Sequence, residues 1–256
     1  NLIKMKNHLL VMTLLACTAF YGQSKNKSEY WNTWRYVAKE GMQEKFEQAA
    51  AKKTSMFNKT AETAIYTYRV ITGPNTGTYE RVESGKKPAD YDLDRTAEGK
   101  YWRDNVGEYI AQNKGQVRWV KLKNGTYDPN PDNAAPSKYV QLTTYNVKAD
   151  KIMHFRRFMN RVAEVAEKRG FPQARLLFRL VSGGNRNQFV LAYPYDKYER
   201  EPMAESETTF REDYTELFGW GSLDEDRQNF DASLEYWGEQ RETMVLVPEM
   251  STKLKN

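Results

Sequence analysis

Cysteine is almost absent from this chain: the single one, Cys17, lies in an apolar segment near the start. Histidine is nearly as scarce, because His154 is the only one that follows that segment. The main part of the chain therefore has no disulfide, no cysteine metal site and no thiol nucleophile. A haem or metal site would depend on His154, which the helical period places away from the apolar stripe of its helix. We expect no metal site and no cofactor.

Long runs of one charge are also missing. The chain has 39 Lys and Arg against 34 Asp and Glu, and the two signs alternate along its whole length. The longest basic clusters are pairs such as Lys52-Lys53 and Arg156-Arg157. Nucleic-acid binding needs basic residues gathered on one face or in runs. We therefore expect no nucleic-acid partner, and we interpret the net charge of +5 as favouring solubility alone.

The motifs of common catalytic and binding sites are incomplete. There is no Ser-His-Asp set, and the glycines in 183–185 connect two predicted strands instead of opening a phosphate-binding helix. The acidic stretch 90–94 (DYDLD) resembles the start of a calcium loop. Such a loop needs glycine at its sixth position and glutamate at its twelfth, where this chain has Arg95 and Tyr101. These patterns indicate solvated turns.

The first 22 residues have the pattern of an export signal. Two lysines precede the apolar stretch 9–21, which is shorter than the roughly 20 residues of a lasting membrane span. Small-residue cleavage sites follow Ala19 and Gly22, and we predict cleavage after Gly22, which leaves a periplasmic or secreted protein. The alternative is that 14–17 acts as a lipobox and that a lipidated Cys17 holds the protein on a membrane. Leucine before the alanine counts against that alternative.

One stretch of sequence occurs twice. Residues 66–79 (YTYRVITGPNTGTY) return as 176–189 (LLFRLVSGGNRNQF), 110 residues further along the chain. Aligned positions include Arg69 with Arg179 and Gly73 with Gly183. Each copy reads as a strand, a turn rich in Gly and Asn, and a second strand. Repetition of a whole supersecondary unit predicts two halves of similar design.

The elements predicted around the two copies agree with that duplication. In 30–37 the alternation places Trp31, Thr33 and Arg35 on one face of a strand. The first half reads as strand 30–37, helix 41–59, strands 66–71 and 78–83, weak helix 90–113 and strand 117–122. The second half reads as strand 139–147, helix 150–169 capped by Asp150, hairpin 175–195, helices 206–218 and 223–239, and strand 244–247. We predict a signal peptide at 1–22, a first repeat at 23–122, a proline-containing linker at 123–138 and a second repeat at 139–256.

A β-α-β-β-α-β order is the ferredoxin-like arrangement, in which two helices cover one face of a four-stranded antiparallel sheet. Two such units, each with the motif aromatic-Arg-[Val/Leu]-[Ile/Val]-[Thr/Ser]-Gly-x-Asn, resemble the dimeric α+β barrel superfamily. The resemblance is to its NIPSNAP-like and antibiotic-biosynthesis-monooxygenase-like branches, and to exported tandem proteins of Bacteroidetes. It implies an α+β chain whose two sheets pack face to face around a shared cavity. It carries over no catalytic residue.

Four side chains are candidates for contacts to a ligand: Arg69, Arg179, Tyr36 and Tyr145. Arginines on equivalent strands alternate with Tyr68 and Phe178. If those aromatic rings pack under the helices, the guanidinium groups point into the barrel, where they suit an anionic or carbonyl-bearing ligand. The alternatives are that the arginines are a repeated structural device and that the strand aromatics belong to the core.

Three functions remain open on this evidence. The first is an exported protein that binds a small, partly apolar molecule between its sheets. The second is a cofactor-free enzyme of monooxygenase or isomerase type. The third is a non-catalytic envelope interaction protein with a filled barrel. A cavity of several hundred cubic ångströms favours the first two, and a barrel packed solid favours the third. The oligomeric state stays open.

Overall fold

The structure is a computed structural model that describes residues 28–131, 135–199 and 206–254. The predicted signal peptide, with Cys17, lies outside these residues. No helix in the described ranges combines the length and the apolar character that a membrane crossing needs.

The centre of the fold is a closed antiparallel barrel of strands in the order β1-β3-β2-β8-β5-β7-β6-β4. Alternating β-branched and aromatic residues suit such strands, because one face packs inward and the other packs under helices. The barrel strands are β1 (Tyr30–Ala38), β2 (Tyr66–Thr72), β3 (Tyr79–Lys86), β4 (Ile110–Lys121), β5 (Tyr139–Val147), β6 (Leu176–Ser182), β7 (Gln188–Tyr195) and β8 (Leu234–Leu246).

Two seams join the strands of the first half to those of the second. The first four strands lie in the order β4-β1-β3-β2 and the last four in the order β8-β5-β7-β6. At the β2-β8 seam, Gly73 has φ +103°, and a Cβ there would lie 2.6 Å from the backbone oxygen of Arg241. At the β6-β4 seam, Gly183 has φ +98°, and a Cβ would lie 2.6 Å from the backbone oxygen of Gln116. Glycine is required at both positions because each turn packs directly on the neighbouring backbone.

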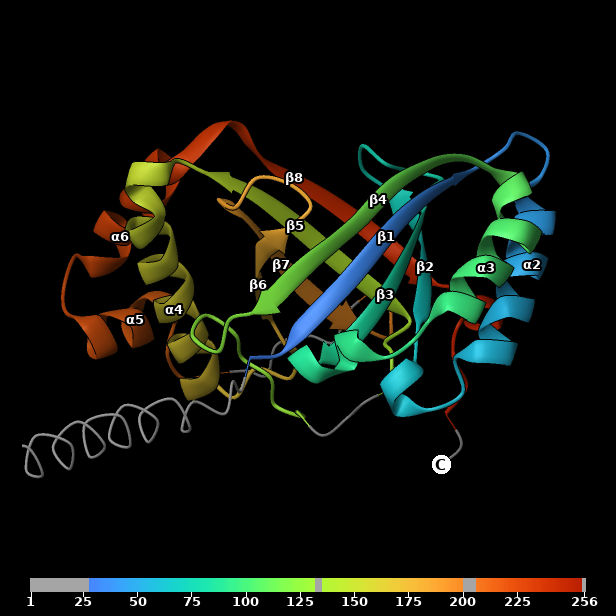
Figure 1. Cartoon of the computed structure of the whole chain (residues 1–256). Helices are drawn as coiled ribbons and strands as arrows, with labels where there is room; N and C mark the ends of the chain where they lie inside the picture. Colours follow the sequence, from blue (N-terminus) through green and yellow to red (C-terminus); the bar gives the residue numbers. More distant parts are fainter. Residues whose placement is uncertain (1–27, 132–134, 200–205, 255–256) are drawn as a thin grey trace, which may run out of the picture.

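Two groups of helices lie outside the barrel, at opposite sides of it (Figure 1). One group is α2 (Gln43–Phe57) and α3 (Thr96–Asn105), and the other is α4 (Ile152–Lys168), α5 (Phe210–Phe218) and α6 (Ser222–Ser233). Phe46 of α2 and Phe155 of α4 are fully buried against the outer faces of the strands. Aromatic rings thus pack between the helices and the barrel wall on both sides of the molecule.

Most predicted elements are present, and the main errors concern two long strands. β4 begins at Ile110, inside the region predicted as weakly helical, and β8 begins at Leu234, inside the predicted helix 223–239. The early segments 110–116 (IAQNKGQ) and 234–240 (LEYWGEQ) carry Gly and polar residues without a regular alternation, so their own pattern does not favour a strand. Pairing with β1 and with β5 supplies the strand geometry instead. Trp237, expected on a helix, lies on β8 with φ 56° and is exposed.

The predicted cap of the second long helix is also different. Asp150 lies in a short 3-10 turn, Ala149–Lys151, and α4 starts at Ile152 without a side-chain cap. The helix ends at Lys168, just before Gly170, which has the positive φ typical of a helix end. Met159 and Ala163 of α4 are buried, whereas His154 is exposed, as the helical period predicts.

Candidate functional site

A cavity of about 680 Å³ lies inside the barrel and is lined by strands of both halves. Its middle is apolar and aromatic. The rings of Trp31 and Phe178 pack with centroids 4.8 Å apart, and the indole Nε1 of Trp119 donates to Thr33 Oγ1 at 3.2 Å. The middle of the wall is completed by Tyr66, Tyr68, Val82, Leu142, Val190 and Met244. The space therefore suits a molecule with a sizeable apolar body.

The side chains at the repeated aromatic and arginine positions face the opposite way from the prediction. Tyr68 and Phe178 line the cavity, so the residues next to them on each strand face outward. Arg69 is exposed, and Arg179 donates its Nε to the backbone oxygen of Arg186 at 3.2 Å on the outer side. The structure thus corrects the expectation that this pair of arginines points into the barrel.

The two predicted tyrosines also lie outside the cavity. Tyr36 packs with Phe46 of α2, and Tyr145 packs with Phe155 of α4, at a ring centroid distance of 5.3 Å for the second pair. Burial raises the pKa of Tyr36 to about 12. Both residues are core residues beneath the helices, so none of the four predicted ligand contacts lines the cavity.

Arg35 on β1 is the arginine that lines the cavity. Its Nε donates to Glu80 Oε2 on β3 at 2.6 Å. Its Nη1 and Nη2 donate to the two carboxylate oxygens of Glu242 on β8, at 3.3 and 2.9 Å. Burial lowers the pKa of Arg35, but the two carboxylates outweigh that effect and raise it overall, so the guanidinium stays charged. The signal for Arg35 was present in the sequence, since it shares a strand face with Trp31 and Thr33.

Glu80 and Glu242 hold Arg35 from two different strands. Glu80 lines the cavity and is only 7% exposed, and Glu242 lies behind Arg35 at 6% exposure. Asn75, in the turn after β2, donates its side-chain amide to Glu242 and accepts from Lys114 Nζ at 3.1 Å. At one end of the barrel, these hydrogen-bonded polar side chains therefore lie beside an apolar space.

The other end of the cavity is lined by residues of the segment that the sequence predicts as a linker. Asp128–Pro131 and Ala135–Ser137 contribute to this lining, together with Glu29 and Lys121, which form an ion pair at 3.3 Å. The hydroxyl of Tyr68 donates to the backbone oxygen of Ser137 at 3.3 Å. The predicted linker thus contributes to the site as well as connecting the halves.

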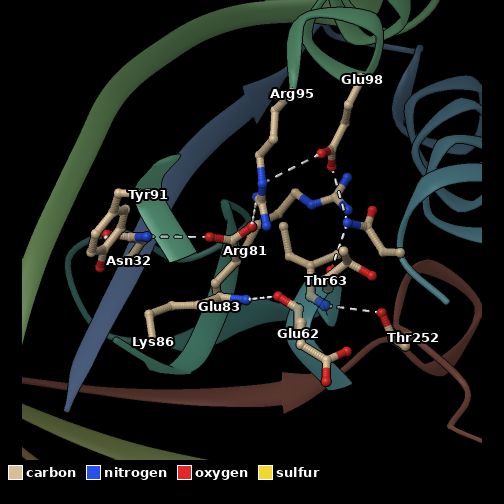
Figure 2. Close-up of polar contacts among 12 residues, drawn as sticks. Asn32, Glu62, Thr63, Arg81, Glu83, Lys86, Tyr91, Arg95, Glu98 and Thr252 are labelled. Atoms are coloured by element: carbon tan, nitrogen blue, oxygen red, sulfur yellow. Dashed lines mark hydrogen bonds and ion pairs between the residues drawn. The ribbon is translucent and has the colours of Figure 1, made fainter. Parts of the chain in front are cut away.

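A second polar cluster lies outside the barrel, between β3 and the helices α2 and α3 (Figure 2). Arg81 is its centre and is 1% exposed. Its Nη2 donates to Thr54 Oγ1 at 2.7 Å, and its guanidinium lies 4.7 Å from the ring centroid of Trp102. Its Nε and Nη1 are buried and have no hydrogen-bond partner among the described residues. Burial lowers the pKa of Arg81 to about 10.

Carboxylates surround this cluster without pairing directly with Arg81. Figure 2 shows Glu83 between Arg95, which forms an ion pair with it, and Asn32, which donates to it at 3.2 Å. Glu98 accepts from Lys53. Burial, with a further contribution from the charge of Arg81, lowers the pKa of Lys53 to about 8. These charges tie α2 and α3 to the sheet, and we interpret them as structural.

The histidine and the acidic stretch form no metal cluster in the described part of the chain. His154 is exposed on α4, on the outer side of the barrel wall. Asp90 accepts from the backbone N–H of Lys87 at 2.8 Å, which closes a 3-10 turn, Pro88–Asp92. Within the described ranges no group of three or more His, Cys, Asp or Glu side chains is arranged to hold a metal ion.

Comparison with known proteins identifies the fold. No protein-family model and no curated protein matches the chain. Among solved structures, a proposed monooxygenase from Lactobacillus acidophilus superposes with a TM-score of 0.55 at 10% identity, covering 89% of this chain and 97% of its own. A proposed monooxygenase from Fusobacterium nucleatum gives 0.55 at 11% identity, covering 86% and 93%. A chlorite dismutase from Candidatus Nitrospira defluvii gives 0.51 at 9% identity, covering 88% and 94%.

These neighbours belong to the dimeric α+β barrel superfamily. The closed antiparallel barrel with helices outside it is the fold that this chain shares with them. At 9 to 11% identity the likeness defines the fold class and transfers no activity and no residue role.

Proposed function

We propose that this chain binds a small, partly apolar molecule inside its barrel. The observation that carries the proposal is the cavity of about 680 Å³, with aromatic walls and the Arg35–Glu80 pair at one end. Ligand sites in proteins typically measure about 300 to 1,000 Å³ and combine apolar walls with a few ordered polar groups. A barrel filled by its own side chains would have favoured an interaction protein without a ligand, and the cavity counts against that function.

We further propose that the two halves are tandem ferredoxin-like repeats of an exported protein. The matching strand orders β4-β1-β3-β2 and β8-β5-β7-β6 support the repeat, as do the equivalent seam contacts of Gly73 and Gly183. The apolar stretch at 9–21 supports export to the periplasm or beyond, with lipidation at Cys17 as the alternative. We therefore expect the ligand to be a molecule that occurs outside the cytoplasm.

A cofactor-free enzyme is the second candidate, and one observation favours it. The Glu80 carboxylate stands at the border of the apolar space, where a general base would have to lie. Such an enzyme would convert the molecule that it binds, so binding in the cavity is common to both proposals. Turnover that is lost in Glu80→Gln while binding is retained would establish the enzyme.

Binding can be tested with N-phenyl-1-naphthylamine, a neutral apolar dye that becomes fluorescent in apolar surroundings. Trp31 and Trp119 line the cavity and can transfer excitation energy to a dye bound there. The cavity is blocked in the variant Val190→Trp, because Val190 lines it. The matched control is Val181→Trp, which makes the same change at a position that is 50% exposed on β6.

The expected result is saturable binding of the dye with energy transfer from tryptophan in the wild-type protein and in Val181→Trp. In Val190→Trp we expect a loss of affinity of at least about tenfold, since the new side chain fills part of the binding space. Absence of saturable binding by the wild-type protein would overturn the proposal. Equal binding by both tryptophan variants would place the dye elsewhere and would also contradict it.

A further inference from the structure

We propose that the molecule bound in the barrel is an amphiphile whose polar group is a protonated amine, and that Glu80 receives this group. The inference rests on the proposed function and names the class of ligand. It reverses the sequence expectation of an anionic or carbonyl-bearing ligand, which assumed arginines with free guanidinium groups inside the barrel.

Arg35 already has its counter-ions. Three of its N–H groups donate to carboxylate oxygens, one to Glu80 and two to Glu242. The bonds to Glu242 are bidentate, which is the strongest arrangement that a guanidinium forms with a carboxylate. A carboxylate or phosphate on the ligand would find only the two remaining N–H groups of Arg35, beside two carboxylates that already neutralise it.

One of the two carboxylate oxygens of Glu80 accepts no hydrogen bond from the described residues. Oε2 accepts from Arg35, but Oε1 has no hydrogen-bond partner among the described residues, although Glu80 is 7% exposed. Oε1 is not one of the fully enclosed unpaired atoms, so it keeps accessible surface, and Glu80 lines the cavity. A carboxylate oxygen removed from bulk water needs a donor, and burying it without one costs about 1 to 3 kcal/mol or more. A ligand N–H in the cavity provides that donor.

The charges at this end of the barrel are not balanced. Two carboxylates, Glu80 and Glu242, stand against one guanidinium, which leaves one negative charge in excess. Lys114 is exposed and bonds to Asn75 instead of either carboxylate. An ammonium group neutralises the excess charge, whereas an anionic group doubles it. The cavity therefore discriminates by charge in favour of an amine.

The cavity walls that extend from Glu80 are aromatic. Tyr68 is paired with Glu80 across β2 and β3, and both side chains line the cavity. The Tyr68 hydroxyl reaches Ser137 at the other end, so its ring extends along the wall from the level of Glu80, and further along the cavity Trp31 and Phe178 are in contact. Aromatic faces attract cations, and the attraction grows when water is excluded. Walls of this kind suit both the charged group and the apolar body of the ligand.

The test is displacement of bound N-phenyl-1-naphthylamine by three competitors with the same apolar chain. Dodecylamine, dodecanol and dodecanoate are compared at pH 7, each below the concentration at which it forms micelles. The same series is measured for Glu80→Gln, which removes the charge and keeps the shape of the side chain. The matched control is Glu249→Gln, an equal charge change at an exposed residue outside the lining of the cavity.

For the wild-type protein and Glu249→Gln we expect dodecylamine to displace the dye at a concentration at least about tenfold lower than dodecanol, with dodecanoate the weakest. In Glu80→Gln the advantage of the amine over the alcohol should disappear. Equal displacement by the three competitors, or preference for dodecanoate, would overturn the inference even though the dye binds. Failure of the wild-type protein to bind the dye would instead overturn the proposed function.

Discussion

Replacing Gly73 by alanine tests how closely the two halves approach at the β2-β8 seam. The new Cβ would lie 2.6 Å from the backbone oxygen of Arg241 and 3.0 Å from Cγ of Glu242, so the seam would have to move apart. Gly77, in the same turn, also has a positive φ of +87°, but nothing lies within 4 Å of a Cβ built there. Gly77→Ala is therefore the matched control, because it carries the backbone penalty without the close contact.

The magnitudes follow from these two contributions. An alanine at positive φ costs about 1 to 2 kcal/mol, and this term is common to both variants. Forcing a methyl group into a packed contact adds typically about 1 to 3 kcal/mol. We expect Gly77→Ala to lower the free energy of unfolding by about 1 kcal/mol and Gly73→Ala by about 3 kcal/mol. Gly183→Ala should resemble Gly73→Ala, since its Cβ would lie 2.6 Å from the backbone oxygen of Gln116.

Urea unfolding followed by tryptophan fluorescence and circular dichroism measures these differences, with the slope against urea as a check on a shared unfolding reaction. Gly73→Ala should also weaken binding of the neutral dye, because Glu242 lies at the seam and holds Arg35. If Gly73→Ala and Gly77→Ala are equally stable, the seam is looser than the structure describes and the reasoning fails.

Three further predictions concern buried charges outside the cavity. Asp226 is buried and accepts from Tyr214 and from two arginines of α4, so Asp226→Asn should lower the free energy of unfolding in urea by about 3 kcal/mol. Asp224 lies in an exposed ion pair, so Asp224→Asn should lower it by less than about 1 kcal/mol. Equal losses in the two variants would refute this prediction. Burial lowers the pKa of Lys53 to about 8, so the folded chain releases this proton before the unfolded chain does. The difference in the free energy of unfolding between the wild-type protein and Lys53→Met should therefore rise by up to about 1 kcal/mol per pH unit from pH 8 towards 10. A difference that does not change with pH would contradict this prediction. Because two nitrogen atoms of Arg81, Nε and Nη1, are buried without a hydrogen-bond partner among the described residues, Arg81→Met should leave the free energy of unfolding unchanged or raise it, and a loss above about 2 kcal/mol would disprove this account.

The hairpins and the first strand of each half are predictable from the sequence, because their signals are local. Positive-φ glycines at Gly73 and Gly183 and the alternation of residues on either side mark the turns and strands of both copies. The starts of the long strands β4 and β8 are not predictable, since 110–116 and 234–240 lack the alternation of apolar and polar residues that marks a strand. Their strand geometry comes from partners distant in sequence, β1 and β5.

The candidate site was harder to predict for a different reason. In this barrel strands such as β2 and β6 are buried on both faces, under helices on the outside and around the cavity on the inside. Alternation separates Tyr68 from Arg69 but does not say which of them faces inward. Arg35, by contrast, shares its face with Trp31 and Thr33, and all three line the cavity. Its partner Glu242 lies on β8 outside the predicted strand 244–247, so the pairing could not be foreseen.

The central claim is that the barrel holds a small molecule, and native mass spectrometry tests it most directly. The wild-type protein and Val190→Trp are purified under mild conditions from the envelope of the natural host, and the mass of each is measured before and after denaturation. The account predicts an excess mass on the wild-type protein that disappears on denaturation and is absent from Val190→Trp. A wild-type protein without excess mass, or an excess mass that Val190→Trp retains, would contradict it.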